Sequence, residues 1–352
     1  MNPLKLTYWI SASIVITALF ACTRYPQALE LSGYTMGTNY SVQVIVSDKT
    51  QVMETLATKI EETLTDFDQR FSNYRDSSEI NQFNNYTGDD WLEVSPDFLS
   101  ILQQGIKVSE LSNGAFDMTI GPLVDLWGFG PSYNQKTLPS KTEIDVLLES
   151  AGFQFLEIQS APPAARKTKP NVKLDFSAIA KGFAVDHIWE LLDQAGFSSY
   201  MVEVGGEIRT RGVRADGNNW TIGIENPLFN NDKDSIEIIQ SVVPLRDMAI
   251  ATSGDYRNYF MHEEKRYSHM LDPRTGWPVS NELTAVSVIS KKAIDADALA
   301  TAFMVLGAET SMELAIQEKI AVQLTLIKAS GPQVLQSPAY KNYLSKYITD
   351  IS

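Results

Sequence analysis

Residues 200–225 read YMVEVGGEIRTRGVRADGNNWTIGIE, and this stretch decides the predicted fold. It contains three short runs rich in β-branched residues, at 200–204, 207–212 and 220–225, which are separated by glycine, asparagine and aspartate. Asp216-Gly217 is a strong signal for a hairpin turn. Strands joined by such short turns pair in the antiparallel sense, so this part of the chain predicts antiparallel hairpins.

Helices and further strands are mixed on both sides of this stretch. Apolar residues at helical spacing predict a helix over 181–195 that stops at Gly196. Further helices are predicted at 51–67, 96–111, 142–151, 295–306 and 311–318, and further strands at 39–46, 236–243, 284–290 and 322–328. Residues 160–170 contain three prolines and predict an exposed connection. Because the elements show no regular βαβ alternation and no long polar linker divides them, we expect an α+β fold.

The composition excludes several kinds of site. The chain has 352 residues, of which 44% are hydrophobic and 20% charged, with one cysteine and three histidines. One cysteine cannot form an intrachain disulfide, a multi-cysteine zinc site or an iron–sulfur cluster. The formal net charge of −14 repels phosphate backbones, so we do not expect nucleic acid as a partner.

The single cysteine ends an N-terminal hydrophobic segment. Lys5 precedes the uncharged stretch 6–21, which is short for a membrane span of about 20 apolar residues and fits a secretory signal peptide. The stretch ends Leu19-Phe20-Ala21-Cys22, which resembles a bacterial lipoprotein box with Cys22 as the lipidated residue. An ordinary signal peptide or an uncleaved anchor is the alternative. We therefore predict a signal peptide over 1–21, a lipid-anchored tether over 22–31 and one folded domain over 32–352.

An acidic residue and a hydroxyl stand four residues apart near the start of the helix at 295–306. Asp297 and Thr301 therefore lie on the same side of that helix, one turn apart. A carboxylate with a hydroxyl, and without a nearby histidine or cysteine, suits a hard cation such as Mg²⁺. The alternative is that the aspartate merely caps the helix and favours its dipole.

Two more segments are candidates for binding or chemistry. Residues 175–182, DFSAIAKG, place small residues and Lys181 at a helix start, where N–H groups and a lysine favour anions such as a pyrophosphate; a capped, closely packed helix is the alternative. His269 lies in a polar turn and is able to accept a proton from a hydroxyl near neutral pH, although a structural role is the alternative. We assign His187 and His262 to structure. The glycine turns at 204–207 and 253–256 either let a backbone approach a ligand or simply turn the chain.

The order of the motifs is more specific than any one of them. In chain order they are Met36-Gly-Thr, Phe71-Ser-Asn-Tyr74-Arg, Asn113-Gly-Ala115-Phe116-Asp117, Asp175-Phe-Ser-Ala178-Ile-Ala-Lys181-Gly182, Gly205-Gly206-Glu, Ser253-Gly-Asp, His269-Met-Leu-Asp-Pro-Arg-Thr-Gly and Asp297-Ala-Leu-Ala-Thr301. This succession resembles the ApbE family, the FAD:protein FMN transferases, and it runs from about Leu31 to beyond Leu326.

The resemblance implies a T-fold-like α+β architecture that binds FAD in a cleft between its halves. It also implies a Mg²⁺-dependent transfer of FMN from FAD to a threonine hydroxyl of a target protein, with release of AMP. The metal would be held by Asp297, Thr301 and the backbone carbonyl of Ala178. His269 is the predicted general base, with flavin stacking as the alternative. The implied flavin or adenine contacts are Met36, Tyr74, Ala115, Phe116, Asp117, Asp175, Lys181, His269 and Leu271.

The same resemblance implies a location and partners. Members are typically periplasmic lipoproteins, which agrees with the signal that ends at Cys22. The expected acceptor is a subunit of an electron-transport complex, of the Rnf type or of a sodium-pumping quinone reductase. Three alternatives stay open: hydrolysis of FAD to FMN and AMP, a non-catalytic flavin-binding lipoprotein, and a lipid-anchored solute-binding protein. Two positions depart from the family pattern, because Ala300 stands where some members carry a second carboxylate and Lys181 where an acid is expected.

Overall fold

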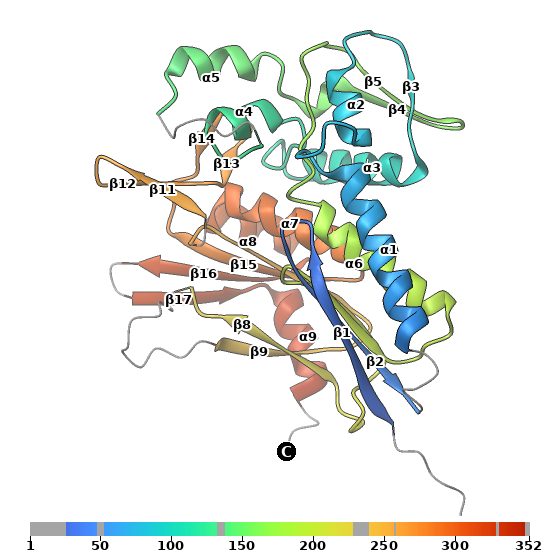
Figure 1. Cartoon of the computed structure of the whole chain (residues 1–352). Helices are drawn as coiled ribbons and strands as arrows, with labels where there is room; N and C mark the ends of the chain where they lie inside the picture. Colours follow the sequence, from blue (N-terminus) through green and yellow to red (C-terminus); the bar gives the residue numbers. More distant parts are fainter. Residues whose placement is uncertain are drawn as a thin grey trace, which may run out of the picture.

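An eight-stranded antiparallel sheet forms the centre of the molecule in the computed structural model (Figure 1). The structure describes residues 26–47, 53–131, 138–227, 239–256, 258–328 and 331–348. In spatial order the strands are β1 (Gln27–Thr35), β2 (Thr38–Val46), β6 (Tyr200–Val204), β7 (Glu207–Arg211), β10 (Ala249–Gly254), β15 (Leu283–Ser290), β16 (Ala321–Lys328) and β17 (Gly331–Gln336). The predicted α+β class, with mixed helices and antiparallel sheets, is confirmed.

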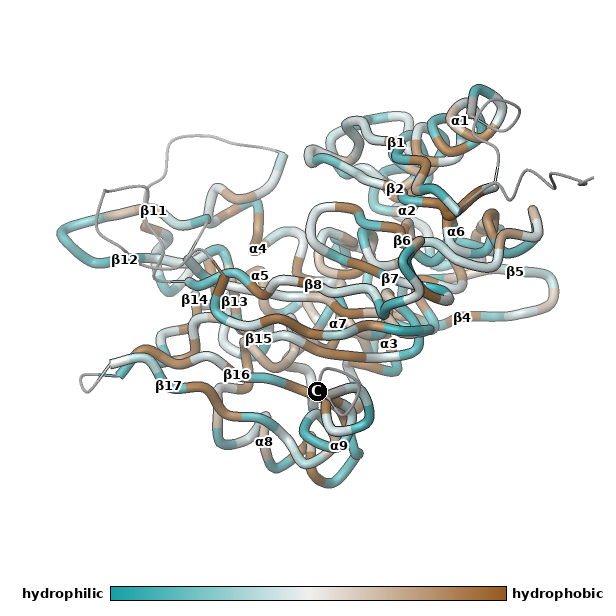
Figure 2. Tube along the Cα trace, turned by 90° about the horizontal axis from the view of Figure 1, so that it is seen from below, coloured by the Kyte–Doolittle hydropathy of each residue, from teal (hydrophilic) through white to brown (hydrophobic). Residues whose placement is uncertain are grey.

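Helices cover one face of this sheet. Helix α6 (Ala180–Gln194) packs on β6 and β7, and α7 (Ala293–Leu306) packs on β10 and β15. A second row of helices lies outside them, with α1 (Met53–Phe71) against α6 and α3 (Pro96–Leu111) against α7. Helix α8 (Ala308–Gln317) belongs to the same layer. Because it is enclosed on all sides, α7 is apolar around most of its circumference, and Figure 2 shows β15 and α7 largely in the hydrophobic colour.

The opposite face of the sheet is covered by a ribbon and the last helix. These are β8 (Trp220–Glu225), β9 (Ile239–Leu245) and α9 (Pro338–Ile348). Ile222 and Leu245 from the ribbon form a second core with Tyr340 of α9 and Ile250 of the main sheet.

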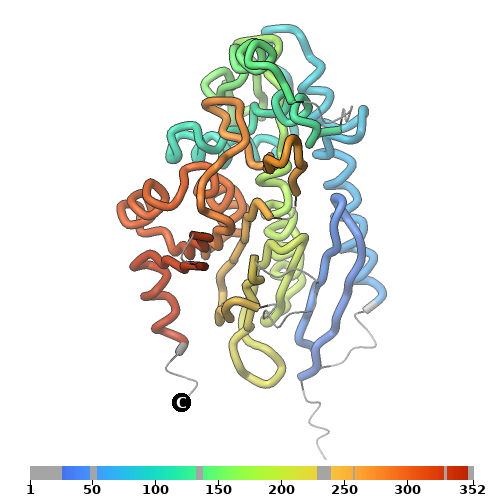
Figure 3. Tube along the Cα trace, turned by 90° about the vertical axis from the view of Figure 1, so that its left-hand side faces the viewer, coloured from blue at the N-terminus to red at the C-terminus, as the bar shows by residue number. Residues whose placement is uncertain are grey.

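A smaller lobe lies at one end of the molecule. It contains α2 (Glu79–Asn85), α4 (Gly121–Leu126), α5 (Lys141–Leu148), the short 3-10 turn Phe153–Phe155 and a three-stranded sheet of β3 (Leu92–Glu93), β5 (Pro163–Lys167) and β4 (Leu156–Ser160). A β-arm made of β11 (Tyr259–His262), β12 (Lys265–Ser268), β13 (Leu271–Asp272) and β14 (Trp277–Pro278) joins it. Trp127 fixes this arm, because its indole Nε1 donates to the carbonyl of Gly276 at 2.8 Å. Figure 3 shows this lobe at the end opposite the start of β1 and the end of α9.

Most predicted elements are present within a few residues of their expected ends. Helix α3 begins as predicted at Ser95-Pro96, where the Ser95 hydroxyl accepts the N–H of Phe98. The structure corrects the tether, because β1 begins at Gln27 and buries Leu29 and Leu31 against the helices. Cys22, the signal peptide and residues 236–238 of one predicted strand lie outside the described residues.

Two predictions about connections were wrong. Residues 160–170 are not an exposed connection, since β4 and β5 pair there and Ala165 and Lys167 are buried. Asp216-Gly217 does form a turn, in which the Gly217 N–H donates to the Arg214 carbonyl at 2.9 Å. However, β7 and β8 on either side of it belong to different sheets, so the turn does not close a hairpin. Among the described helices, none is long and apolar enough to cross a membrane.

Candidate active site

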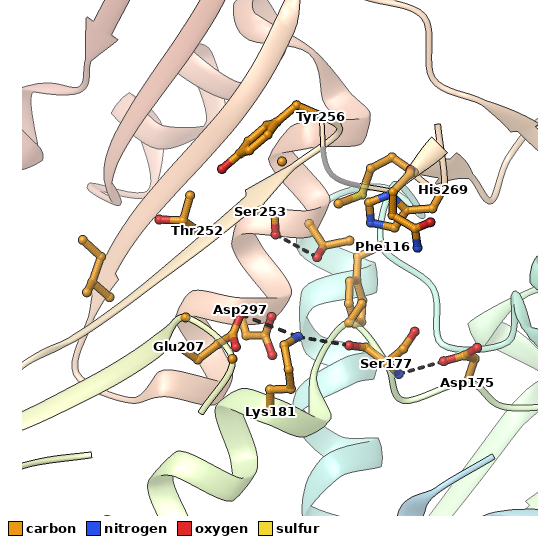
Figure 4. A pocket seen from close by; sticks show the side chains of 18 of the residues that line it. Phe116, Asp175, Ser177, Lys181, Glu207, Thr252, Ser253, Tyr256, His269 and Asp297 are labelled. Carbon is orange, nitrogen blue, oxygen red and sulfur yellow. Dashed lines mark hydrogen bonds and ion pairs between the residues drawn. The ribbon is translucent and has the colours of Figure 1, made fainter. Parts of the chain in front are cut away.

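A cavity of about 650 Å³ lies where the sheet, the small lobe and the β-arm meet (Figure 4). Its walls come from segments far apart in the sequence: 115–124, 175–181, 203–208, 222–225, 250–256 with 258, 269–273 and 297–301. Ten of the residues predicted for the site line this cavity, namely Ala115, Phe116, Asp117, Asp175, Ala178, Lys181, His269, Leu271, Asp297 and Thr301. The fold therefore brings most of the predicted set together.

Helices α6 and α7 cross closely at one end of the cavity. The Asp297 carboxylate of α7 accepts the backbone N–H of Gly182 at 2.9 Å, and the Asp186 carboxylate of α6 accepts the N–H groups of Ala293 and Ile294 at the start of α7. Asp186 therefore caps α7, and Asp297 does not cap its own helix but accepts an N–H in the first turn of α6. Asp297 is 2% exposed and points across the helix contact into the cavity.

Oxygen atoms dominate the same end of the cavity. The Thr301 hydroxyl, one turn after Asp297, lies 3.2 Å from the Ser253 hydroxyl of β10, and Ala178 lines the cavity just before α6. The described residues contain no group of three or more histidine, cysteine, aspartate or glutamate side chains placed to hold a metal. A cation bound here would need the Thr301 hydroxyl, backbone carbonyls and oxygens of a bound ligand in addition to Asp297, which is the donor set that Mg²⁺ accepts.

Lys181 faces two carboxylates at this end. Its ammonium Nζ lies 3.6 Å from Glu207 Oε1 and 3.5 Å from the Ser177 carbonyl oxygen. Burial by itself lowers the pKa of Lys181, but the Asp297 and Glu207 carboxylates outweigh it and raise that pKa above its usual value. Burial raises the pKa of the Glu207 carboxyl, although Lys181 opposes that shift.

Glu207 is the residue that sequence reasoning missed. The motif Gly205-Gly206-Glu was noted for its glycines, and those two residues form the tight turn from β6 to β7 with φ of 62° and 103°. That turn brings Glu207, which is 4% exposed, into the cavity wall beside Lys181. An acidic residue directly after a two-glycine turn was the available signal.

The flavin-binding loops predicted from the motifs are fixed by buried hydrogen bonds. Asp117 accepts the N–H and hydroxyl of Thr119 and the N–H of Phe153, so its carboxylate positions the loop. Asp175 accepts the N–H of Ser177 at 2.7 Å, and its own N–H donates to the Met118 carbonyl. Burial raises the pKa of both aspartates, against the effect of these hydrogen bonds.

His269 lies on the β-arm side of the cavity. Its Nδ1 is 2.8 Å from the Asn258 carbonyl oxygen, so in the neutral ring Nδ1 carries the proton and Nε2 is the accepting nitrogen. Burial lowers the pKa of His269 below its usual value, and the positive charge of Lys181 adds to this shift. The imidazole is therefore neutral at pH 7 and able to accept a proton.

Two predicted contacts do not line the cavity. Met36 sits in the turn between β1 and β2 with φ of 49°, and the Tyr74 side chain is 71% exposed. The chain at Tyr74 still lies near Asp175, because the neighbouring Asn73 side chain donates to the Leu174 carbonyl at 2.9 Å.

Comparison with known proteins gives a consistent result. The model of the ApbE family matches residues 36–324. An FAD:protein FMN transferase of Vibrio cholerae serotype O1 is 38% identical over 338 residues, covering 96% of this chain and 99% of that protein. One from Haemophilus influenzae is 35% identical over 341 residues, covering 96% and 97%.

Solved structures agree with the sequence matches. The flavin transferase ApbE from Vibrio cholerae has a TM-score of 0.82 at 37% identity and covers 91% of this chain and 100% of its own. The apo form of Pseudomonas stutzeri flavinyl transferase ApbE also has a TM-score of 0.82, at 35% identity, covering 91% and 98%. With a family match over most of its length and relatives that align end to end, this chain belongs to the ApbE family.

Proposed function

We propose that this protein transfers FMN from FAD to a threonine hydroxyl of a target protein, forming a phosphoester and releasing AMP. The observation that carries the proposal is the convergence of Asp297, Thr301, Lys181 and His269 on one cavity. A carboxylate–hydroxyl pair suits a Mg²⁺ ion that accompanies a pyrophosphate, and a lysine suits the pyrophosphate itself. A neutral imidazole suits a hydroxyl nucleophile. The relatives named FAD:protein FMN transferase support this assignment.

The residues at the α6–α7 crossing fit a Mg²⁺ ion. Asp297, Thr301 and the backbone carbonyl of Ala178 would hold it, since all three line one end of the cavity and offer only oxygen. When bound, the ion would neutralise charge on the pyrophosphate.

The reaction needs one bond made and one bond broken at phosphorus. The threonine oxygen attacks the phosphorus of the FMN half of FAD, the bond from that phosphorus to the bridging oxygen breaks, and AMP leaves with this oxygen. His269 Nε2 takes the hydroxyl proton. Lys181 provides positive charge beside the phosphates, and the loops held by Asp117 and Asp175 orient the substrate.

The test mixes the purified protein with FAD, Mg²⁺ and a threonine-bearing acceptor subunit. We expect flavin fluorescence on the acceptor in a denaturing gel and one AMP released per label. Asp297→Asn keeps an oxygen for the Gly182 N–H but loses the charge, so transfer should fall by at least about 100-fold, as for loss of one strong transition-state contact. Asp295→Asn on the same helix is the matched control, because Asp295 does not line the cavity.

The same assay separates the alternative functions. Free FMN and AMP without labelled acceptor would indicate hydrolysis with water as the nucleophile. FAD binding without any AMP would indicate a flavin-binding protein and would contradict both enzyme activities.

We propose further that lipidated Cys22 anchors the protein at the periplasmic face of a bacterial membrane. The hydrophobic stretch before Cys22 and the lipoprotein-like box support this. A subunit of an Rnf-type or sodium-pumping quinone reductase complex is the proposed acceptor. Palmitate labelling in cells should be lost in Cys22→Ser, and unchanged labelling would refute the anchor.

A further inference from the structure

Helix α2 of the small lobe contributes no residue to the cavity wall, yet two of its asparagines hold loops that carry predicted flavin contacts (Figure 1). Asn81 and Asn84 are three residues apart, so they lie on the same side of the helix. The Asn81 side chain donates from Nδ2 to the carbonyl oxygens of Asn73 at 2.8 Å and Arg75 at 3.1 Å. These two residues are the neighbours of Tyr74, so Asn81 fixes the turn in which Tyr74 stands.

Asn84 pairs with both backbone groups of Leu174, as a neighbouring strand would. Its Oδ1 accepts the Leu174 N–H at 2.7 Å, and its Nδ2 donates to the Leu174 carbonyl at 2.9 Å. The same carbonyl also accepts the side-chain Nδ2 of Asn73 at 2.9 Å. Asn84 is 6% exposed and Leu174 is fully buried, so loss of the amide would leave the Leu174 N–H without this partner, away from water. The loop of Tyr74 and the segment before Asp175 therefore meet at one carbonyl.

The segment that follows Leu174 also holds a third loop. The Asp175 N–H donates to the Met118 carbonyl at 2.7 Å, directly after the predicted flavin contacts at 115–117. Both Asp175 and 115–117 line the cavity, and Figure 4 shows Asp175 in its wall. A shift of Leu174 would therefore displace two walls of the cavity together.

We propose that Asn84 is a positioning residue for the flavin substrate: its two hydrogen bonds hold Leu174 so that the three loops around it keep the geometry that FAD binding requires. This inference rests on the proposed function, because it takes FAD to be the ligand of the cavity. Asn84 does not line the cavity and acts only through the backbone that it holds. His269 and Asp297, the groups proposed for the chemistry, lie on other elements, so loss of Asn84 weakens FAD binding more than it slows transfer.

Asn84→Ala removes both hydrogen bonds to Leu174. The Kd of FAD, measured by flavin fluorescence without an acceptor, should rise at least about tenfold, because small displacements of positioning groups are costly. In the transfer assay the KM for FAD should rise by a similar factor, whereas kcat should change much less. Hydrogen exchange of the ligand-free protein should become faster at 174–177, since the Leu174 N–H loses its acceptor.

Asn281→Ala is the matched control, because Asn281 makes the same two kinds of hydrogen bond away from the cavity. Its Oδ1 accepts the Leu283 N–H at 2.9 Å, and its Nδ2 donates to the Met304 carbonyl at 3.3 Å. Both variants should have a lower melting temperature than the parent. Only Asn84→Ala should change the Kd of FAD and the exchange at 174–177, and an equal rise of the Kd in both variants would reduce the role of Asn84 to stability.

Asn73→Ala tests the same arrangement if Asn84→Ala does not fold. It removes one of the two side-chain donors to the Leu174 carbonyl at a half-buried site. The Kd of FAD should then rise by about threefold, as for loss of one ordinary hydrogen bond. An unchanged Kd in this variant would contradict the proposal.

The two readouts separate this inference from the proposed function. Faster exchange at 174–177 in Asn84→Ala, in a protein whose parent does not bind FAD, would refute the function alone. Unchanged exchange at 174–177, or an unchanged Kd of FAD in the folded Asn84→Ala variant, would refute the positioning role even if the parent transfers FMN. A fall in kcat as large as the rise in KM would also refute it, because Asn84 would then affect the chemistry as much as binding.

Discussion

Gly182 sets how closely α6 and α7 approach each other. A β-carbon there would collide with the Ala293 carbonyl oxygen and would lie 2.8 Å from Asp297 Cβ. Gly182→Ala should therefore push the helices apart, lower the free energy of unfolding by about 1–3 kcal/mol as overpacking does, and weaken Mg²⁺ binding. Urea unfolding and calorimetry measure the two effects.

Gly223→Ala is the stability control for this prediction. At that position in β8 an added β-carbon would meet the flexible side chain of Ile239, so little stability should be lost. Equal losses in the two variants would contradict the steric argument for Gly182.

The lowered pKa of His269 predicts how kcat/KM depends on pH on the acid side. The base must be neutral, and its pKa is lowered by burial, so kcat/KM should stay high down to a pH below the usual histidine value near 6.5 and fall only at lower pH. His269→Gln should lower kcat/KM by roughly 100-fold or more and remove this fall. An acid limb that survives unchanged in the variant would assign it to another group and leave flavin stacking as the role of His269.

The sequence predicts which residues belong to the site better than it predicts which residues each of them contacts. Asp297 and Thr301 share one helix turn, so their proximity follows from helical spacing alone. Glu207 was missed because its burial depends on a β-turn docking against α6, which local spacing does not encode. The exposure of Tyr74 likewise depends on tertiary packing and not on its aromatic character.

Helices α6 and α7 support the site by reciprocal capping. Asp186 caps α7 with both carboxylate oxygens and pairs with Arg209 at 2.8 Å, although it is 4% exposed. Asp186→Ala leaves Arg209 and two helix N–H groups without their partner, so the free energy of unfolding should fall by about 3–5 kcal/mol.

The matched control for Asp186→Ala lies on the same helix. Asp193 pairs with Arg211 at the surface, where an ion pair contributes at most about 1 kcal/mol, so Asp193→Ala should change stability little. If the two variants were equally destabilised in urea, the capping argument would be wrong.

Strand β5 carries a buried lysine that the site does not use. Lys167 donates to the Asn84 carbonyl at 3.2 Å, and Asn84 holds the backbone of Leu174 just before Asp175. Burial, with a smaller contribution from Lys173, lowers the pKa of Lys167 to about 8. The cost of keeping it charged at pH 7 is about 3 kcal/mol, from the difference between its pKa values in the unfolded and folded states.

The lowered pKa of Lys167 determines whether its contribution to the free energy of unfolding rises or falls with pH. Between about pH 8 and 10.5 the unfolded chain binds more protons at this lysine than the folded one, so stability from this group rises with pH. Lys167→Met should therefore be more stable than the parent at pH 7, and its advantage should shrink by pH 10. Lys59→Met is the control, and a constant difference across this range in urea unfolding would contradict the assignment.

The same strand shows why connections are harder to predict than helices. Three prolines in 160–170 indicated an exposed link, but β5 packs against α3 and Lys167 donates to Asn84 of α2, so tertiary burial overrides the local signal. The turn at Asp216-Gly217 was predicted correctly. The strands with which β7 and β8 pair, however, are determined by packing in the main sheet and against α9. Capped helices such as α3 were predicted well because their signals are local.

At the scale of the whole molecule, the cavity lies between the small lobe and the rest of the protein. The walls come from the small lobe, the β-arm, the main sheet, β8 and the starts of α6 and α7, so no single segment predicts the cavity from sequence. Only the order of the motifs along the chain indicated that these segments lie together, because that order resembles the ApbE family and its fold.

A ligand that touches all these walls should stabilise the molecule as one unit. At a free FAD concentration 100 times its Kd, with Mg²⁺ present, the free energy of unfolding should rise by about 2.7 kcal/mol. Circular dichroism in urea should show one transition shifted to higher denaturant with an unchanged slope. Hydrogen exchange should slow together at 115–120, 175–181 and 297–301, since these segments line one cavity. Protection confined to one of these segments, or a second unfolding transition, would show that FAD binds one lobe alone.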